Sequence, residues 1–421
     1  MNEARVIIFS TVWPEPSSSA AGVRQMHWVH LFRELGYRVT LISPSKVKNE
    51  KDWGSLELPE GVDALPMPLN RESVKEDLKK LNPAIVMFDR FILEEQFGPH
   101  VYEACPDALI LMETQDLHLV RRARDELKEK FLETKTFPPA FYQTETALRE
   151  TSSLLRVDYS FVVSSFEEKL LKEEFQIGSE KVKWVPFFYA RPIEVKEKRL
   201  SFLEKKDFCW IGNFRHEPNI DGLRWFRKEI WPLIRKQLPE ARIEIYGAYP
   251  PEEVMAWNNV KNGIEVKGSA LTLDEVFENA RVNVAPLRFG AGVKGKIMEG
   301  FRYGVPCVTT KVGMEGLFPL DETAIFPGLE MNSPESFANA CAKLHEDEAI
   351  WKKHSLTALE KMMQLFSAAK QVPELKTLIG TLLEKKKNQQ LPNWTSKVMR
   401  FEGNQSRYYF TKWIELKETN R

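Results

Sequence analysis

A glycine-rich segment that follows a predicted strand holds the residue types that bind phosphate groups. Gly290, Gly292 and Gly295 are interspersed there with Lys294 and Lys296. Glycine lets the backbone adopt positive φ and approach a ligand closely. The lysine charges and the free amides of the helix that begins here both favour an anion. The segment therefore predicts a diphosphate site. The alternative is a loop that is rich in glycine only because it turns, with solvated lysines.

About one helical turn beyond this segment stands Glu299, whose carboxylate can accept hydrogen bonds from two ribose hydroxyls. The stretch from Gly290 to Lys296 also fits the first seven positions of a P-loop. Ile297 then occupies the place of the serine or threonine that binds magnesium, so we reject the P-loop interpretation. The glycine-rich segment together with Glu299 is typical of a site that binds a nucleotide diphosphate at a strand-to-helix turn.

A second group of polar residues follows predicted strands in the N-terminal half. His118 and Arg121 come after the apolar run 109–112, and Arg90 follows the run 85–88. Open α/β sheets bind ligands at the carboxyl ends of their parallel strands. We therefore expect His118 in the site and Arg90 and Arg121 near an acceptor. The alternatives are a histidine that only caps local structure and arginines that are simply solvated.

The first predicted strand-to-helix turn, residues 16–22, is small and rich in backbone amides. It ends on Gly22, which we expect to face the donor, and Arg24 lies just inside the following helix as a further acceptor candidate. Many strand-to-helix turns share this composition, so the turn alone is a weak signal.

Short apolar runs alternate with amphipathic helical patterns along most of the chain. Strands are predicted at 6–9, 39–42, 85–88, 109–112, 161–163, 208–211, 243–246, 264–266 and 282–285. Ser164 followed by Glu167 is typical of a capping box at a helix start. Strands separated by helices of roughly 10–15 residues imply parallel sheets covered on both faces. We predict an α/β protein with two facing Rossmann-like domains and a central cleft.

The composition excludes several classes of protein. Lys and Arg number 60, as do Asp and Glu, so bulk charge predicts no general nucleic-acid binding. The four cysteines form no CxxC pair, which argues against a disulfide framework or a structural zinc site. No apolar run is long enough to span a membrane. We expect a cytoplasmic protein, with a peripheral place at a membrane as a second option.

No divalent metal ion is expected in the reaction. No two aspartates lie two positions apart, so the chain lacks an Asp-x-Asp metal motif. Lysine side chains and helix termini can neutralise a diphosphate instead. The prediction is a site with no metal and no cofactor besides a nucleotide co-substrate.

Segments in both halves of the chain match the motifs of one enzyme family. They are 290–299, 304–310 and 313–317 at the predicted donor site, 210–214 and 218–223 at the start of the second half, and 164–175 and 182–186 at the end of the first. Together they resemble the retaining GT-B glycosyltransferases of the glycosyl transferases group 1, or family 4, type. The resemblance extends over most of residues 5–375. It implies transfer of a hexosyl unit from a nucleotide-diphosphate sugar with retention of configuration.

The resemblance also implies roles for individual residues. Lys296 and Lys294, with Arg215, would hold the donor diphosphate, and His118 would face the donor sugar. The implied donor-binding residues are Glu299, Arg215, Gly292, Gly295, Gly212, Val266 and Gly22, with Val266 near the nucleobase. The family often has a glutamate eight positions before Glu299, but Ala291 stands there. The contact to the sugar must then come from backbone amides or from another residue.

Two rival functions remain beside glycosyl transfer. A sugar-nucleotide epimerase or a phosphorylase can use the same fold and similar phosphate contacts. A non-catalytic module that binds a nucleotide sugar is the other rival, and Ala291 is the feature in its favour. The predicted partner is a nucleotide sugar, and the acceptor is left open among a glycan, a lipid, a protein and RNA.

The pattern divides the chain into three parts. We expect an N-terminal Rossmann-like domain on the acceptor side at 1–190 and a nucleotide-sugar-binding Rossmann-like domain at 191–384. The tail, 385–421, carries nine Lys or Arg, three Asp or Glu and six large aromatic residues. We expect it to dock on the body, because Trp394 and Trp413 are costly to expose. The alternative is an arm that binds an anionic acceptor, either a phospholipid surface or RNA.

Overall fold

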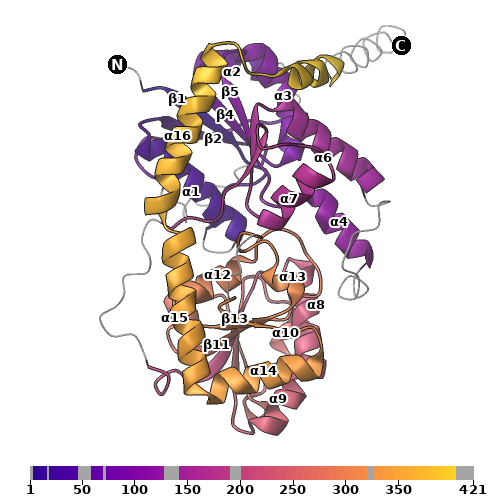
Figure 1. The fold of residues 1–421 in the computed structure, drawn as a ribbon, viewed down its shortest axis with the longest axis vertical. Coiled ribbons are helices and arrows are strands. Elements are labelled where there is room, and N and C mark those ends of the chain that lie inside the picture. Colours follow the sequence, from indigo (N-terminus) through magenta and orange to yellow (C-terminus); the bar gives the residue numbers. More distant parts are fainter. Residues whose placement is uncertain are drawn as a thin grey trace.

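Two parallel β-sheets, one in each half of the chain, organise the protein. The structure is a computed structural model, and it describes residues 3–16, 19–45, 58–69, 73–127, 142–189, 201–320 and 326–403. In Figure 1 the N-terminal sheet lies in the upper half of the molecule and the C-terminal sheet in the lower half. The predicted α/β architecture of two Rossmann-like domains is confirmed.

The N-terminal sheet has seven parallel strands in the order β3-β2-β1-β4-β5-β6-β7. They are β1 (Arg5–Phe9), β2 (Arg38–Ser43), β3 (Val62–Pro66), β4 (Ile85–Asp89), β5 (Leu109–Glu113), β6 (Tyr159–Val162) and β7 (Val182–Trp184). Successive side chains of a strand point to opposite faces. Accordingly, Val6 and Ile8 join one buried apolar cluster, and Ile7 and Phe9 join another. Both faces of the sheet are therefore covered.

Helices cover the two faces of this sheet. They are α1 (Ala20–Glu34), α2 (Val74–Leu81), α3 (Phe91–Ala104), α4 (His118–Leu127), α6 (Glu145–Arg156) and α7 (Ser165–Glu173). On one face, Leu78 of α2 and Leu154 of α6 enter the cluster that holds Phe9. On the other face, Trp28 and Phe32 of α1 pack in the second cluster.

The C-terminal sheet has six parallel strands in the order β10-β9-β8-β11-β12-β13. They are β8 (Asp207–Ile211), β9 (Ile243–Tyr246), β10 (Ile264–Gly268), β11 (Ala280–Ala285), β12 (Cys307–Thr309) and β13 (Gly328–Glu330). The helices are α8 (Glu217–Trp225), α9 (Trp231–Gln237), α10 (Glu252–Met255), α11 (Leu273–Phe277), α12 (Gly295–Arg302), α13 (Lys311–Met314), α14 (Pro334–Glu346) and α15 (Glu348–Leu365). A π-helical turn, Phe226–Ile230, joins α8 to α9, and a 3-10 turn, Val260–Asn262, precedes β10.

The last long helix returns to the first domain. After α15 the chain forms α16 (Ala368–Lys387), which runs alongside the N-terminal sheet in Figure 1. Its side chains Leu375, Ile379 and Leu382 are buried in the apolar cluster that also contains Trp28. The predicted domain end at residue 384 is therefore wrong, because this apolar helix face belongs to the N-terminal domain. The predicted boundary at residues 190 and 191 lies outside the described residues.

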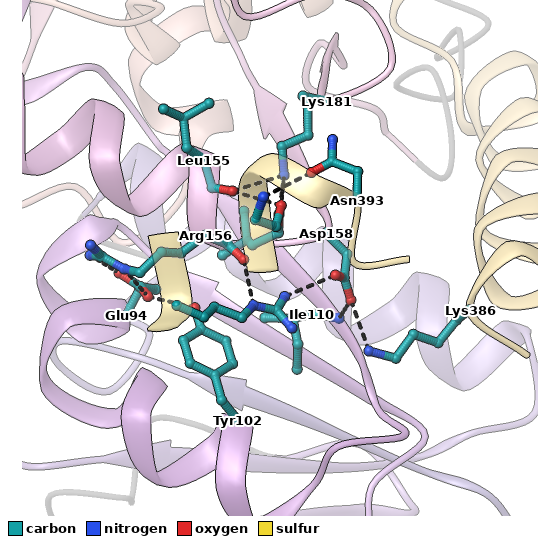
Figure 2. Close-up of polar contacts among 12 residues, drawn as sticks. Glu94, Tyr102, Ile110, Leu155, Arg156, Asp158, Lys181, Lys386 and Asn393 are labelled. Atoms are coloured by element: carbon teal, nitrogen blue, oxygen red, sulfur yellow. Dashed lines mark hydrogen bonds and ion pairs between the residues drawn. The ribbon is translucent and has the colours of Figure 1, made fainter. Parts of the chain in front are cut away.

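The tail continues from α16 onto the N-terminal domain as far as it is described. Figure 2 shows the polar contacts that hold it. The buried carboxylate of Asp158 accepts from Arg400 Nη2 at 2.8 Å and from Lys386 Nζ at 3.3 Å. Ser396 is fully buried and accepts from Lys181 Nζ at 2.7 Å. Residues 385–403 therefore dock on the body through charged and polar contacts.

Burial of Trp394, the expected cause of docking, is not observed. Trp394, which we expected to be buried, is 79% exposed. The docking of residues 385–403 depends on ion pairs instead of on that tryptophan. The remaining tail, with Trp413, lies outside the described residues.

Candidate donor site

The candidate site lies where the strand order of the C-terminal sheet reverses. β8 and β11 are neighbours there, although the chain adds β9 and β10 on one side and β12 and β13 on the other. Ligands of doubly wound sheets bind at such a point, outside the carboxyl ends of the strands. Two loops meet there: Gly212 follows β8, and the glycine-rich loop, residues 286–294, follows β11. A Cβ on Gly212 would lie 2.9 Å from Lys296 Nζ, so glycine leaves room for this lysine.

Lys296 occupies the first turn of α12, facing the loop after β8. Its Nζ donates to Asn219 Oδ1 at 2.7 Å and lies 4.5 Å from the centre of the Trp210 ring. Burial lowers the pKa of this lysine to about 7, because the ammonium loses hydration. The structure thus places a single ammonium beside the amides at the start of a helix, which is a suitable arrangement for an anionic ligand.

Lys294 has a different position from the one expected. Only 8% of it is exposed, and its Nζ donates to the carbonyl oxygens of Gly292 at 2.6 Å and Ala291 at 3.3 Å. Burial, with the nearby charge of Arg124, lowers the pKa of this lysine to about 8. The prediction that Lys294 presents a charge to the diphosphate is therefore corrected: its ammonium is used to hold the glycine-rich loop.

Two of the predicted ligand-facing glycines stand where the domains touch. Gly292 has φ +64°, and a Cβ there would lie 2.8 Å from the Cβ of Asp116 in the N-terminal domain. A Cβ on Gly295 would lie 2.8 Å from the Cβ of Ala20, at the start of α1. Any larger residue would push the two domains apart. Close approach of the domains is thus one physical reason for glycine at both positions, and their contact with a donor stays a prediction.

The start of α1 packs closely against the turn that precedes it. A Cβ on Gly22 would lie 2.5 Å from the carbonyl carbon of Glu15, so this glycine lets the preceding turn fold back. Arg24 is completely buried and donates to Glu113 Oε2 at 2.9 and 3.1 Å and to the carbonyl of Pro186 at 2.6 Å. The prediction that Arg24 contacts an acceptor is therefore wrong, because its charge is paired inside the N-terminal domain.

Glu299 lies on α12 against the chain that leaves the N-terminal domain. Its carboxylate accepts from the hydroxyl of Tyr189 at 3.0 Å and pairs with Arg302 at 2.5 Å. Burial raises the pKa of this carboxyl, and the charge of Arg302 opposes that rise. Because a carboxylate has about four acceptor positions, these two contacts leave capacity for ribose hydroxyls.

Glu299→Gln is expected to weaken donor binding with little change in turnover at saturation, because this side chain would touch ribose and not the reacting bond. Loss of a hydrogen bond to a charged group costs about 1.5–3 kcal/mol, so the dissociation constant should rise at least about tenfold. Calorimetric titration with a nucleotide sugar measures this, and the exposed Glu229→Gln serves as the control. An unchanged dissociation constant would remove Glu299 from the ribose site.

His118 is the first residue of α4 and is held on two sides. Its backbone N–H donates to Glu150 Oε1 at 2.9 Å, and its ring meets Phe91 edge-on at 5.2 Å. Burial lowers the pKa of the imidazole to about 4, so it is neutral near pH 7. Its buried Nε2 has no hydrogen-bond partner among the described residues. A neutral imidazole with a free nitrogen is suited to hydrogen-bond a sugar hydroxyl.

Charged groups of both domains converge around a histidine that the sequence did not indicate. His216 precedes α8, and burial lowers its pKa, as do the charges of Arg121, Lys296 and Arg90, while Asp116 opposes them. Arg121 itself forms two hydrogen bonds to Asp116, at 2.7 and 2.5 Å. The structure thus brings the predicted acceptor arginines to the side of the site that faces Lys296. No spacing signal marked His216, whereas Asn219, the partner of Lys296, lies in the recognised segment 218–223.

Two predicted donor residues lie at the edge of this arrangement. Arg215 is exposed and stacks on the ring of Tyr249, at 3.5 Å from its centre. Val266 lies in β10, which is separated from β8 by β9. Their roles toward diphosphate and nucleobase stay predictions.

Within the described ranges, no group of three or more His, Cys, Asp or Glu residues is placed to hold a metal ion. No helix in this part of the chain is both long and apolar enough to cross a lipid bilayer.

The second domain carries the signature of a known family. Residues 205–347 match the family model described as glycosyl transferases group 1. This part of the chain is therefore similar to the glycosyl transferases group 1. The chain is 22% identical over 350 residues to an uncharacterised 44.6 kDa protein in the cps region of Klebsiella pneumoniae, with 74% of this chain and 84% of that protein covered.

Solved structures show the same fold. A sucrose-phosphate synthase from Thermosynechococcus elongatus has a TM-score of 0.65 at 15% identity, with 91% of this chain and 100% of that chain covered. The pneumococcal O-GlcNAc transferase GtfA, in complex with UDP and GlcNAc, gives 0.65 at 12% identity with the same coverage. The TarM protein of S. aureus gives 0.68 at 10% identity, covering 90% of this chain and 99% of that one. The predicted GT-B fold is therefore confirmed.

Proposed function

We propose that this protein is a glycosyltransferase that moves a hexosyl unit from a nucleotide-diphosphate sugar to an acceptor with retention of configuration. The observation that carries the proposal is the position of Lys296, in the first turn of α12 at the β8–β11 switch point. One lysine beside helix-terminal amides suits the diphosphate of such a donor. UDP and a sugar are present together in the GtfA structure of the same fold.

The reaction breaks the bond between the anomeric carbon and the β-phosphate oxygen. Negative charge then develops on the leaving phosphate, where Lys296 and the amides at the start of α12 stabilise it most in the transition state. The acceptor oxygen bonds to the anomeric carbon on the face that the phosphate leaves, and a phosphate oxygen takes the acceptor's proton. No protein base is needed, and Lys294 contributes by holding the loop beside the phosphate.

The N-terminal domain provides the groups that orient the sugar and the acceptor. The neutral His118 would hydrogen-bond a hydroxyl of the donor sugar through its free nitrogen. Arg90 and Arg121 lie on the same side and would face the acceptor. Such contacts lower the barrier by fixing the reacting groups in one geometry.

We also propose that transfer needs no divalent metal ion. The basis is the lack of an Asp-x-Asp pair in the sequence, together with a lysine and helix amides that can neutralise the phosphates. Turnover in excess EDTA should equal turnover in added Mg²⁺ or Mn²⁺, measured as release of nucleoside diphosphate. Loss of turnover in EDTA that Mn²⁺ restores would contradict the metal-free mechanism.

A product analysis separates transfer from its rivals. The protein is incubated with a panel of labelled nucleotide sugars, with and without pooled glycan, lipid, protein and RNA acceptors, and products are resolved by mass. Transfer predicts a hexose increment on an acceptor, and the fraction that gains it identifies the acceptor class. An epimerase converts the donor sugar to an isomer of equal mass without any acceptor, which chromatography separates from the donor. A phosphorylase consumes inorganic phosphate and releases a sugar phosphate, and a binding module forms no product. Any of these three results would refute the proposal.

A further inference from the structure

A buried glutamate on α7 deviates from its expected local role. Ser164 caps this helix, accepting from the backbone N–H of Glu167 at 3.4 Å, as half of the predicted capping box. The other half would direct the Glu167 carboxylate back to Ser164. Instead, Glu167 Oε1 accepts from the N–H of Leu117 at 3.2 Å and from the N–H of Gly292 at 2.9 Å. One oxygen thus joins a loop of the first domain to the glycine-rich loop of the second.

Gly292 is held through both its backbone N–H and its carbonyl. Its N–H donates to Glu167, and its carbonyl accepts from Lys294 Nζ at 2.6 Å. On a third side the residue lies against Asp116, where a Cβ would come within 2.8 Å. Gly292 follows Ala291, the position at which the family often carries its sugar-facing glutamate. A carboxylate from the opposite domain therefore lies at the neighbouring residue.

The same carboxylate helps to hold His118. The first amides of α4 point at two buried glutamates: Leu117 donates to Glu167, while His118 and Leu119 donate to Glu150 at 2.9 and 2.8 Å. Glu150 belongs to the first domain, as α4 does. Glu167 reaches across the domain junction to Gly292, whereas these two contacts of Glu150 stay inside the first domain.

The first turn of α7 is itself a domain contact. The backbone N–H of Ser165 donates to the carbonyl of Gly316 at 3.2 Å, and its hydroxyl donates to the carbonyl of Phe318 at 2.5 Å. A Cβ on Gly316 would overlap with Ser164 Oγ, so glycine is needed for this approach. Glu167 therefore extends from an element that already contacts the donor domain, which restricts its position.

We propose that Glu167 is a positioning residue for sugar transfer, fixing the His118 loop of one domain against the Gly292 loop of the other. The inference rests on the proposed function. Glu167 touches neither the proposed phosphate position nor the proposed sugar position and acts through Gly292 and the residues before His118, so its loss should lower turnover more than it lowers donor affinity. Correct placement of reacting groups accounts for large parts of enzymatic rate, and small displacements reduce it strongly.

The test compares three variants of the full-length protein. Glu167→Ala removes both hydrogen bonds, whereas Glu167→Gln keeps an oxygen that can accept them. Glu168→Ala is the matched control, because Glu168 is the next residue of α7 and its carboxylate contacts Trp184 and Lys172 within the first domain. Donor dissociation constants, turnover at saturation and hydrogen exchange of the 290–293 loop are measured well below each melting temperature.

Glu167→Ala should lower turnover at least about tenfold, raise the donor dissociation constant by a smaller factor, and speed exchange of the loop amides. Glu167→Gln should recover most of the turnover, and Glu168→Ala should match the wild type in all three measurements. Equal turnover in wild type and Glu167→Ala, or equal loop exchange, would overturn the positioning role. If the wild-type protein showed no turnover with any donor, the proposed function would be refuted. The hydrogen-exchange measurement would still decide whether Glu167 holds the two loops together.

Discussion

Lys296→Ala is expected to reduce turnover at least about 100-fold while the protein stays folded. Removal of one preorganised group that stabilises developing charge typically has an effect of this size. The structure supports such a role, because Lys296 lies at the helix start with its ammonium beside Asn219 and above Trp210. Initial rates of nucleoside diphosphate release measure the effect on turnover, and melting temperatures show whether the variant is folded. Near-normal turnover in the folded variant would remove Lys296 from the site.

Two further variants make this prediction specific. Lys228→Ala removes an exposed lysine of the same domain and should leave turnover unchanged. Lys296→Arg keeps a permanent charge. Because the pKa of Lys296 is about 7, a rising pH removes its proton, so wild-type donor affinity should fall above pH 7. The association constant for the donor should fall by up to about tenfold for each pH unit above 7. In the arginine variant the association constant should not change over this pH range.

Truncation after Glu384 is expected to destabilise the protein by roughly 3–5 kcal/mol, the usual cost of removing one partner from a buried ion pair. The deletion removes Lys386 and Arg400 and leaves the buried Asp158 carboxylate without them. It also removes Ser396, the side chain that Lys181 contacts. Calorimetry should show a melting temperature lower by on the order of 10 °C, and donor turnover should fall with it.

A second truncation, after Gly403, is the matched control. It keeps every tail contact shown in Figure 2 and should melt like the full chain. If this shorter deletion abolishes transfer while hydrolysis of the donor by water persists, residues 404–421 form the acceptor-binding arm. An unchanged melting temperature after truncation at Glu384 would contradict the docking account.

The fold was predictable because its strands are short, apolar and regularly spaced. Ile85–Asp89 and Leu109–Glu113 are buried on both sides, so their sequences are continuous apolar runs. Because helices separate these apolar runs, the strands are expected to pair in parallel within each of the two sheets. The end of the second domain was missed, since α16 is amphipathic like its neighbours and nothing in its sequence shows which domain its apolar face covers.

The candidate site was predictable only in part. The β11–α12 turn with Lys296 was identified, because glycines and lysines before a helix form a recognisable local pattern. Lys294 and Arg24 were assigned wrongly, because a charged side chain gives no sign in sequence of being buried and paired. Glu167 was read as a capping residue, because sequence spacing shows local contacts but not those across the domain junction.

The most direct measurement is a crystal structure of the protein with a bound nucleoside diphosphate. The β-phosphate should lie at the start of α12, with an oxygen about 3 Å from Lys296 Nζ and others facing the first amides of the helix. The ribose should reach Glu299. A diphosphate bound away from α12, or no bound nucleotide at saturating concentration, would contradict the account.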